Sequence, residues 1–166
     1  MNERELRRLM ASFESESIEF KPGIPSRNDI AEYAVGIGNA GGGWLILGVS
    51  DRIPRHVLPL PVPQDEDLAR IRESVADATQ IRIEIETVAT IDGTVLAIRI
   101  PPRPRGVPFH TETGKYLIRL GEGLRGMTLS EIDGIRREAG IELTANPIMG
   151  DPAGMIVPPV WKSCAA

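Results

Sequence analysis

Cysteine is nearly absent from this sequence, which contains only Cys164 among its 166 residues. A single thiol excludes an internal disulfide framework and any zinc site built from several cysteines. Long apolar runs are also lacking, because the longest, Trp44 to Val49, has the length of a strand and is too short for a membrane span. The first ten residues, MNERELRRLM, are charged and contain no apolar core of a signal peptide. We therefore expect a cytoplasmic protein that does not insert into a membrane.

Lysine is scarce as well and occurs only at positions 21, 115 and 162, so arginine supplies most of the positive charge. Arginine suits bidentate phosphate contacts, but a GC-rich genome produces the same bias, and we favour that simpler explanation. The net charge of −4 argues mildly against a protein that coats nucleic acid indiscriminately. Binding depends on local patches, however, so the total charge does not exclude a nucleic-acid partner.

The length of the chain fits one domain with a single core. Apolar periodicity and capping residues predict helices over residues 2–13, from Ser26 for about three turns, over 64–79, and from Thr128 to about Glu138. Strands are predicted at 17–21, 44–50, 81–87, 95–100 and 115–120, with a hairpin turn at Asp92-Gly93. This order indicates an α/β, α+β-like domain in which helices pack on a single mixed, partly antiparallel sheet. We expect the domain to cover 1–139 and the Pro/Gly-rich residues 140–166 to form a C-terminal tail.

Four motifs follow one another along the chain: ESESIEFK (14–21), NAGGGWLILGVSD (39–51), VLAIRIPP (95–102) and YLIRLGEGLRGMTLSEI (116–132). In this order and spacing they resemble the Schlafen-type AlbA-like domain over roughly residues 13–135. The resemblance implies a nucleic-acid-binding α/β domain. In animal members it implies a metal-dependent endoribonuclease that acts on tRNA and rRNA through a Glu, Glu, Asp trio. Bacterial members are often assigned as regulators or ATP-binding proteins.

The acids of that trio map onto Glu14, Glu19 and Asp51, and Lys21 lies next to the second acid. The chain departs from the family pattern after Asp51, where RIPRHVLPLP replaces the usual D-G turn. The animal proteins also build their RNA groove from two related lobes. A single lobe would have to dimerise to form an equivalent groove, so the resemblance implies a homodimer.

Cleavage of a phosphodiester with Mg²⁺ or Mn²⁺ requires two or three carboxylates that converge on the metal. Residues five apart on a straight strand face opposite sides, so Glu14 and Glu19 converge only if the chain turns around Ser15 to Ser17. Alternation with Ile18 and Phe20 places Glu19 on the face away from the core, where Lys21 could hold a phosphate. Asp51 is expected at the C-terminal end of the central strand.

Spacing alone fits a simpler interpretation more readily, in which these acids are solvated at the ends of elements and Lys21 merely pairs with Glu19. Glu16 is an alternative ligand that ranks below the trio. Gly36 to Gly41 satisfies G-x-G-x-x-G, but that fingerprint should open a helix, whereas this stretch ends one. The glycines are therefore predicted to serve tight packing and not nucleotide binding.

The candidate nucleic-acid contacts are Lys21, Arg103, Arg105, Lys115, Arg119 and Arg125, of which Arg103, Arg105 and Lys115 lie in the basic loop PPRPRGVPFHTETGK. His110 and Tyr116 are candidate stacking partners, and an ordinary solvated loop is the alternative. The function we expect is a nucleic-acid-binding, Mg²⁺- or Mn²⁺-dependent endoribonuclease that cleaves structured RNA of the tRNA or rRNA type. The alternative is a non-catalytic DNA- or RNA-binding or transcription-regulatory module, and an ATP-binding protein is less favoured.

Overall fold

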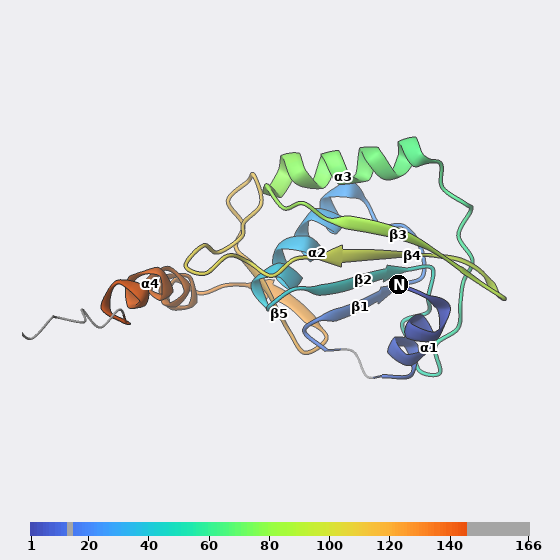
Figure 1. The fold of residues 1–166 in the computed structure, drawn as a ribbon, viewed down its shortest axis with the longest axis horizontal. Helices are drawn as coiled ribbons and strands as arrows, with labels where there is room; N and C mark the ends of the chain where they lie inside the picture. The colour runs from blue at the N-terminus through green and yellow to red at the C-terminus, as the bar shows by residue number, and fades with distance from the viewer. Residues whose placement is uncertain (13–14, 146–166) are drawn as a thin grey trace, which may run out of the picture.

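The computed structural model describes residues 1–12 and 15–145 (Figure 1). Its helices are α1 (Glu3–Ala11), α2 (Arg27–Asn39), α3 (Asp65–Thr79) and α4 (Leu129–Ala145). Its strands are β1 (Ile18–Lys21), β2 (Gly43–Leu47), β3 (Glu84–Thr90), β4 (Gly93–Ile100), β5 (Leu117–Leu120) and β6 (Gly123–Gly126). These bounds agree with the predicted elements to within a few residues, apart from β6 and the end of α4.

The main sheet has the strand order β1-β2-β4-β3. β1 pairs with β2 in parallel, while β2 with β4 and β3 with β4 are antiparallel, so the predicted mixed sheet is confirmed. The predicted strand at 115–120 lies elsewhere, because β5 pairs with β6 in a separate two-stranded antiparallel sheet. Gly121, with φ +56°, supplies the left-handed conformation in the turn between them.

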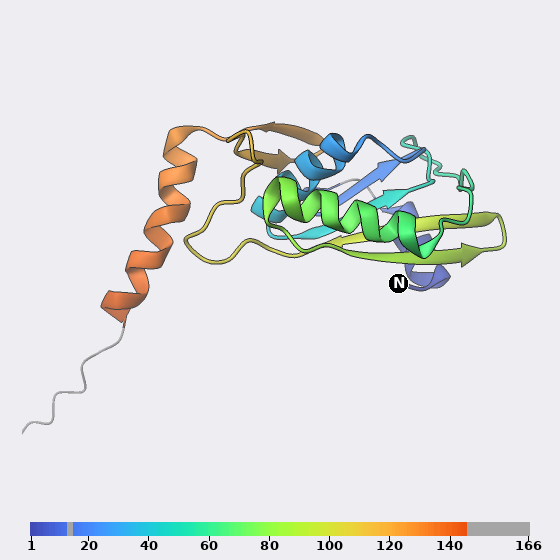
Figure 2. The same cartoon turned by 90° about the horizontal axis from the view of Figure 1, so that it is seen from above.

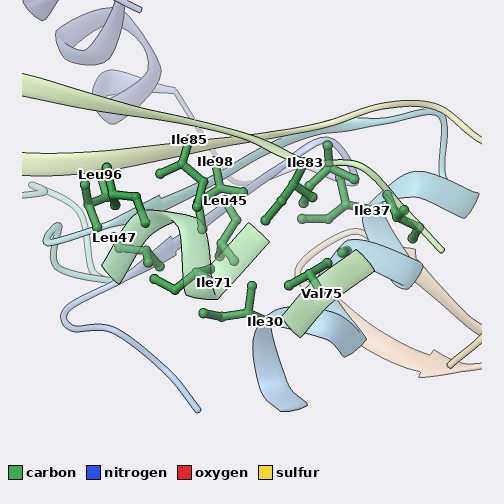
Figure 3. Packing of buried hydrophobic residues seen from close by; sticks show 14 of the residues in the cluster. Ile30, Ile37, Leu45, Leu47, Ile71, Val75, Ile83, Ile85, Leu96 and Ile98 are labelled. Carbon is green, nitrogen blue, oxygen red and sulfur yellow. The ribbon is translucent and has the colours of Figure 1, made fainter. Parts of the chain in front are cut away.

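Both faces of the main sheet carry an apolar layer. On one face, α2 and α3 contribute Ile30, Ile37, Ile71 and Val75, which pack against strand residues such as Leu45 and Ile98 (Figure 3). On the other face, α1 packs Leu6 and Met10 against the strands through a second set, which contains Phe20, Ile46, Val88 and Val95. Because side chains alternate along a strand, a central strand with a layer on each face must be apolar throughout, as β2 is.

The C-terminal half of α2 packs against the β5–β6 hairpin and the loop before it. A Cβ atom at Gly36 would collide with the Leu124 side chain, and one at Gly38 would lie 2.7 Å from the Phe109 ring. Gly42, with φ +83°, donates its N–H to Ile37 O at 2.9 Å and ends the helix. The G-x-G-x-x-G glycines therefore serve close packing, as their place at the end of a helix suggested.

The last described helix, α4, runs away from the rest of the domain (Figure 2). It continues to Ala145, beyond the expected end near Glu138, and residues 146–166 of the expected tail lie outside the described residues. Thr128 and Glu131 form the predicted capping box at its start, with Glu131 N donating to Thr128 Oγ1 at 3.3 Å and Thr128 N to Glu131 Oε2 at 2.8 Å. Within residues 1–12 and 15–145, none of the helices is both long and apolar enough to cross a membrane.

Asn39 joins the end of α2 to the loop and to β5, and its amide provides a test of this packing. Its Nδ2 donates to Phe109 O and Leu117 O at 2.9 and 2.8 Å, and Phe109 N donates to its Oδ1 at 2.8 Å. We expect Asn39→Ala to lower the free energy of unfolding by about 3 kcal/mol, because these part-buried backbone groups lose their partners. Urea unfolding measures the change. The exposed Asn28 of the same helix is the matched control, and Asn28→Ala should stay within about 0.5 kcal/mol of wild type. Equal effects of the two substitutions would contradict the prediction.

Candidate functional site

The chain turns immediately before β1, as convergence of the predicted acids requires. Ile18 N donates to Ser15 O at 3.2 Å, and Ser15 and Ile18 form an isolated antiparallel bridge. Glu14 itself lies outside the described residues, so its position relative to Glu19 and Asp51 stays a prediction. Glu16, the alternative ligand, is exposed in this turn.

Glu19 does not face solvent, contrary to the expectation from strand alternation. Ile18 and Phe20 do point to the same side, toward α1, so Glu19 points to the opposite face of the sheet. That face is also covered, by α2 and the β5–β6 hairpin, and only 4% of Glu19 remains exposed. The prediction was wrong because it assumed that this edge strand had one buried face.

Arg119 of β5 is the main partner of the buried carboxylate. Its Nη1 forms an ion pair with Glu19 Oε2, while its Nε and Nη2 donate to Ser15 O at 3.0 Å and Ile18 O at 3.2 Å. Among the described residues, Glu19 Oε2 accepts no hydrogen bond of ordinary geometry, so the contact is ionic. Arg119 is only 1% exposed. It therefore fastens the hairpin to β1 and leaves no guanidinium surface for a phosphate.

Lys21 contacts the second oxygen of the same carboxylate, with Nζ 2.6 Å from Glu19 Oε1. Its Nζ also lies 5.1 Å from the centroid of the Tyr33 ring in α2, a cation–π contact. Burial lowers the pKa of the Lys21 ammonium, but hydrogen bonds to Glu19 and Tyr33 outweigh this and the net shift is upward. Lys21 is therefore charged at neutral pH, and Glu19 lies between two cations.

Asp51 is exposed and follows β2 at the edge where β1 ends. Gly48 N and Val49 N both donate to Lys21 O, at 2.8 and 3.1 Å, so the segment that leads to Asp51 starts beside the end of β1. The carboxyl ends of adjacent parallel strands are the usual place for a site on an α/β sheet. Asp51 and Lys21 lie at this edge, and Glu19 is two residues earlier in β1.

Arg55 anchors the loop that replaces the D-G turn of the family pattern. Its Nη1 donates to Met10 O at 3.1 Å and Ser12 O at 2.6 Å, and its guanidinium carbon lies 4.2 Å from the centroid of the Phe20 ring. The loop next to Asp51 is thereby tied to the end of α1 and to β1. Sequence reasoning missed Arg55 and Tyr33, because an arginine in a proline-rich loop and a tyrosine on a helix carry no signal of such contacts.

The expected Mg²⁺ or Mn²⁺ stays a prediction, since one of its three expected ligands is not described. Among the described residues, no group of three or more His, Cys, Asp and Glu side chains is placed to hold a metal ion. The oxygens of Glu19 already contact Arg119 and Lys21. A divalent ion bound by Glu19 would have to replace at least one of these contacts.

The predicted nucleic-acid contacts on the other elements form ion pairs at the surface. Arg103 pairs with Glu138 through two hydrogen bonds of 2.7 Å, Lys115 Nζ lies 2.6 Å from Glu32 Oε1, and Arg125 Nη2 lies 2.5 Å from Glu131 Oε1. Hydrogen bonds from Arg125 and Thr128 lower the pKa of Glu131 to about 2. Arg105 is exposed in the loop. The rings of His110 and Tyr116 contact each other, with centroids 5.1 Å apart.

The Glu19–Arg119 pair makes a prediction about stability. We expect Arg119→Met to lower the free energy of unfolding by about 3 kcal/mol, because a buried carboxylate loses a charged partner. The double variant Glu19→Gln/Arg119→Met should lose less than the sum of the single losses, which urea unfolding of all four proteins measures. Arg125→Met, in the neighbouring strand, removes an exposed pair and should shift the midpoint far less. Additive losses for Glu19 and Arg119 would show that the contact does not couple them.

Comparisons with known proteins agree with the fold. The Schlafen, AlbA_2 family matches residues 14–128 of the chain. No curated protein matches significantly. Among solved structures, the DIP2311 protein from Corynebacterium diphtheriae is 18% identical with a TM-score of 0.61, and the match covers 81% of this chain and 31% of that one. The chain thus spans less than a third of the DIP2311 protein.

A second solved structure is similar along most of its own length. It is the N-terminal domain of a protein related to the ATP-dependent DNA helicase RecG, from Nitrosomonas europaea. The identity is 21% and the TM-score 0.55, over 75% of this chain and 89% of that chain. At such identities the two structures establish a shared fold, and the family match covers β1 to the start of α4. The chain belongs to the Schlafen AlbA_2 family.

Proposed function

We propose that this domain binds nucleic acid. The observation that carries the proposal is the Schlafen AlbA_2 match, which extends over the main sheet, α2, α3 and the β5–β6 hairpin. The description of the Nitrosomonas europaea protein as related to a DNA helicase supports the same class of ligand. The homodimer and the cytoplasmic location expected from the sequence stay predictions, and ATP binding remains the least favoured alternative.

Among the candidate contacts, Lys115 and Arg125 are the best placed to meet a phosphate, since 59% and 40% of their side chains are exposed. Their partners Glu32 and Glu131 do not prevent this, because exposed ion pairs are weak and a phosphate can displace a carboxylate. Arg105 lies exposed in the loop between β4 and β5. Lys21 and Arg103 are more enclosed, and the buried Arg119 holds the hairpin that carries Arg125.

We expect Lys115→Ala/Arg125→Ala to weaken binding of a fluorescent tRNA hairpin by about tenfold at moderate salt. The slope of log affinity against log salt should become shallower by about two, because two phosphate contacts are lost. Fluorescence anisotropy across a salt series measures both, with duplex DNA as a second ligand.

Arg7→Ala/Arg70→Ala is the matched control for that experiment. These two arginines are also in surface ion pairs and are 42% and 60% exposed, but they lie on α1 and α3. The control should bind RNA as wild type does. If it loses as much affinity as the test variant, the named contacts are wrong, and if neither RNA nor DNA binds even at low salt, the proposed function fails.

A metal-dependent endoribonuclease is the second candidate, and the placement of Asp51 favours it. The segment that leads to Asp51 starts beside the end of β1, which carries Glu19 and Lys21. In this candidate Glu14, Glu19 and Asp51 would hold Mg²⁺ or Mn²⁺, and Lys21 would hold the phosphate. The bound ion would activate water and stabilise charge on the leaving oxygen. The alternative is a non-catalytic DNA- or RNA-binding or transcription-regulatory module.

Incubation with tRNA and Mn²⁺ or Mg²⁺ separates these possibilities. We expect Asp51→Asn to reduce cleavage to below about a hundredth of wild type, because a ligand of the activating ion is lost. Asp77→Asn, which changes an exposed acid on α3, is the matched control and should cleave normally. EDTA should stop the reaction. Cleavage that persists in Asp51→Asn would show that Glu14, Glu19 and Asp51 are not the metal ligands of the reaction. RNA binding without any cleavage would favour the non-catalytic module.

A further inference from the structure

One row of side chains crosses the main sheet on the face that α1 packs against. The pairing register places Ile18 next to Trp44, Trp44 next to Arg99, and Arg99 next to Glu84. Leu6 and Met10 of α1 pack with residues further along the strands, such as Phe20, and Figure 1 shows α1 near the end where β1 and β2 end. The row lies toward the other end, where β2 begins at the glycine turn, and its Ile18 and Trp44 are partly buried against the same apolar layer.

Two hollows meet at this row. One, of about 450 Å³, lies between the Gly41–Gly43 turn, Arg82 and the Pro101-Pro102 step. The other, of about 410 Å³, lies against α1 and includes Arg8. Trp44 and Arg99 line both of them. Each hollow is within the range of volumes that accept small ligands or a single nucleotide unit.

The basic groups around Trp44 are less neutralised than those on the β5–β6 side. Arg8 and Arg82 are exposed, and neither forms an ion pair with any residue in 1–12 or 15–145. Arg99 Nη1 is 3.6 Å from Glu84 Oε2, an exposed pair that contributes little. Two further acids line the second hollow: Glu86 pairs with the ammonium group of Met1, and Glu5 Oε2 accepts a hydrogen bond from Asn2 N at 2.8 Å. The rim therefore offers arginines that an anion can reach.

The glycine turn leaves the first hollow open on one side and connects it to the basic loop. For Gly41, with φ +112°, no atom of the described residues, apart from Gly41 and its two chain neighbours, lies within 4 Å of the place where a Cβ would be. Arg103 N donates to Gly38 O at 3.0 Å, so the loop that carries Arg103 and Arg105 starts beside this turn. A chain of phosphates can pass from that loop toward Trp44 without meeting a side chain at Gly41.

We propose that Trp44, Arg99, Arg82 and Arg8 form a binding surface for single-stranded nucleic acid. One base stacks on the indole of Trp44, and the flanking phosphates contact the arginines, the combination that binds single strands without reading their sequence. A duplex is a poor ligand, because its bases are already stacked and cannot reach Trp44. The inference rests on the proposed function and adds a second contact surface and a preference for single strands.

The fluorescence of Trp44 measures directly whether a base stacks on its indole. The chain has two tryptophans, so Trp161→Phe leaves Trp44 as the sole source of indole fluorescence. Titration of this variant with dT₁₅ or U₁₅ should quench its emission with the same midpoint as anisotropy of the labelled oligonucleotide. A duplex of equal length at equal salt should bind at least about tenfold more weakly and cause no quench.

Two variants in the same background locate the contact. Arg82→Ala/Arg99→Ala and Trp44→Ala should each weaken single-strand binding by about tenfold or more. Trp44→Phe should keep most of the affinity and serves as the readout if the alanine variant does not fold. The matched control is again Arg7→Ala/Arg70→Ala, which should bind as the parent does.

The outcomes separate this inference from the proposed function. Binding that depends on Lys115 and Arg125, with no quench of Trp44 and no effect of Arg82→Ala/Arg99→Ala, overturns the inference alone. No binding to any nucleic acid overturns both. If Trp44 emission changes with protein concentration and sedimentation shows self-association, the surface binds a second copy of the chain. That result overturns the inference. Equal quenching by free UMP at the same nucleotide concentration assigns a mononucleotide site and also overturns it.

Discussion

The contact between Glu19 and Arg119 is the constraint on which this edge of the domain depends. β1 is an edge strand of the main sheet, and the β5–β6 hairpin covers it through an arginine that is almost fully buried. A buried ion is stable only when its charge is paired and its remaining donors are satisfied. Arg119 meets both conditions, because it pairs with Glu19 and donates to Ser15 O and Ile18 O. One guanidinium thereby fixes the hairpin, the strand and the turn before it.

This contact joins two motifs that are far apart in the sequence. The arginine of YLIRLG is 104 residues from Ser15 of ESESIEFK, yet it holds both the turn and the carboxylate of that stretch. The same carboxylate is the second acid of the expected metal trio. Glu19 therefore has a structural partner to release before it can bind a metal ion, while the exposed Asp51 has no such requirement in the described structure. The two acids differ in what a metal must displace.

Sequence patterns predicted α1, α2, α3 and the four strands of the main sheet, because apolar period, caps and the Asp92-Gly93 turn are local signals. The turn around Ser15 to Ser17, which the structure contains, is the condition for Glu14 and Glu19 to converge. Sequence patterns missed the burial of Glu19, since alternation tells which face a residue takes but not which distant segment covers that face. For the same reason the anchoring of Arg55 and the pairing of β5 with β6 could not be predicted. Such contacts depend on tertiary packing between segments that share no local pattern.

The distribution of charge explains how an acidic chain can still offer sites to a polyanion. With a net charge of −4, acidic side chains outnumber basic ones, and many of the basic ones form ion pairs. On the hairpin side, Lys115 pairs with Glu32 and Arg125 with Glu131. A phosphate that binds there replaces a carboxylate, so the binding energy is only the difference between the two ionic interactions. Around Trp44, by contrast, Arg8 and Arg82 form no ion pair within the described residues, so a phosphate need not displace a paired carboxylate from them. Glu5, Glu84 and Glu86 line the same hollows and reduce the net attraction. The loop that starts beside Gly38 joins the two surfaces, which lets one strand use the indole for a base and both groups of cations for its backbone.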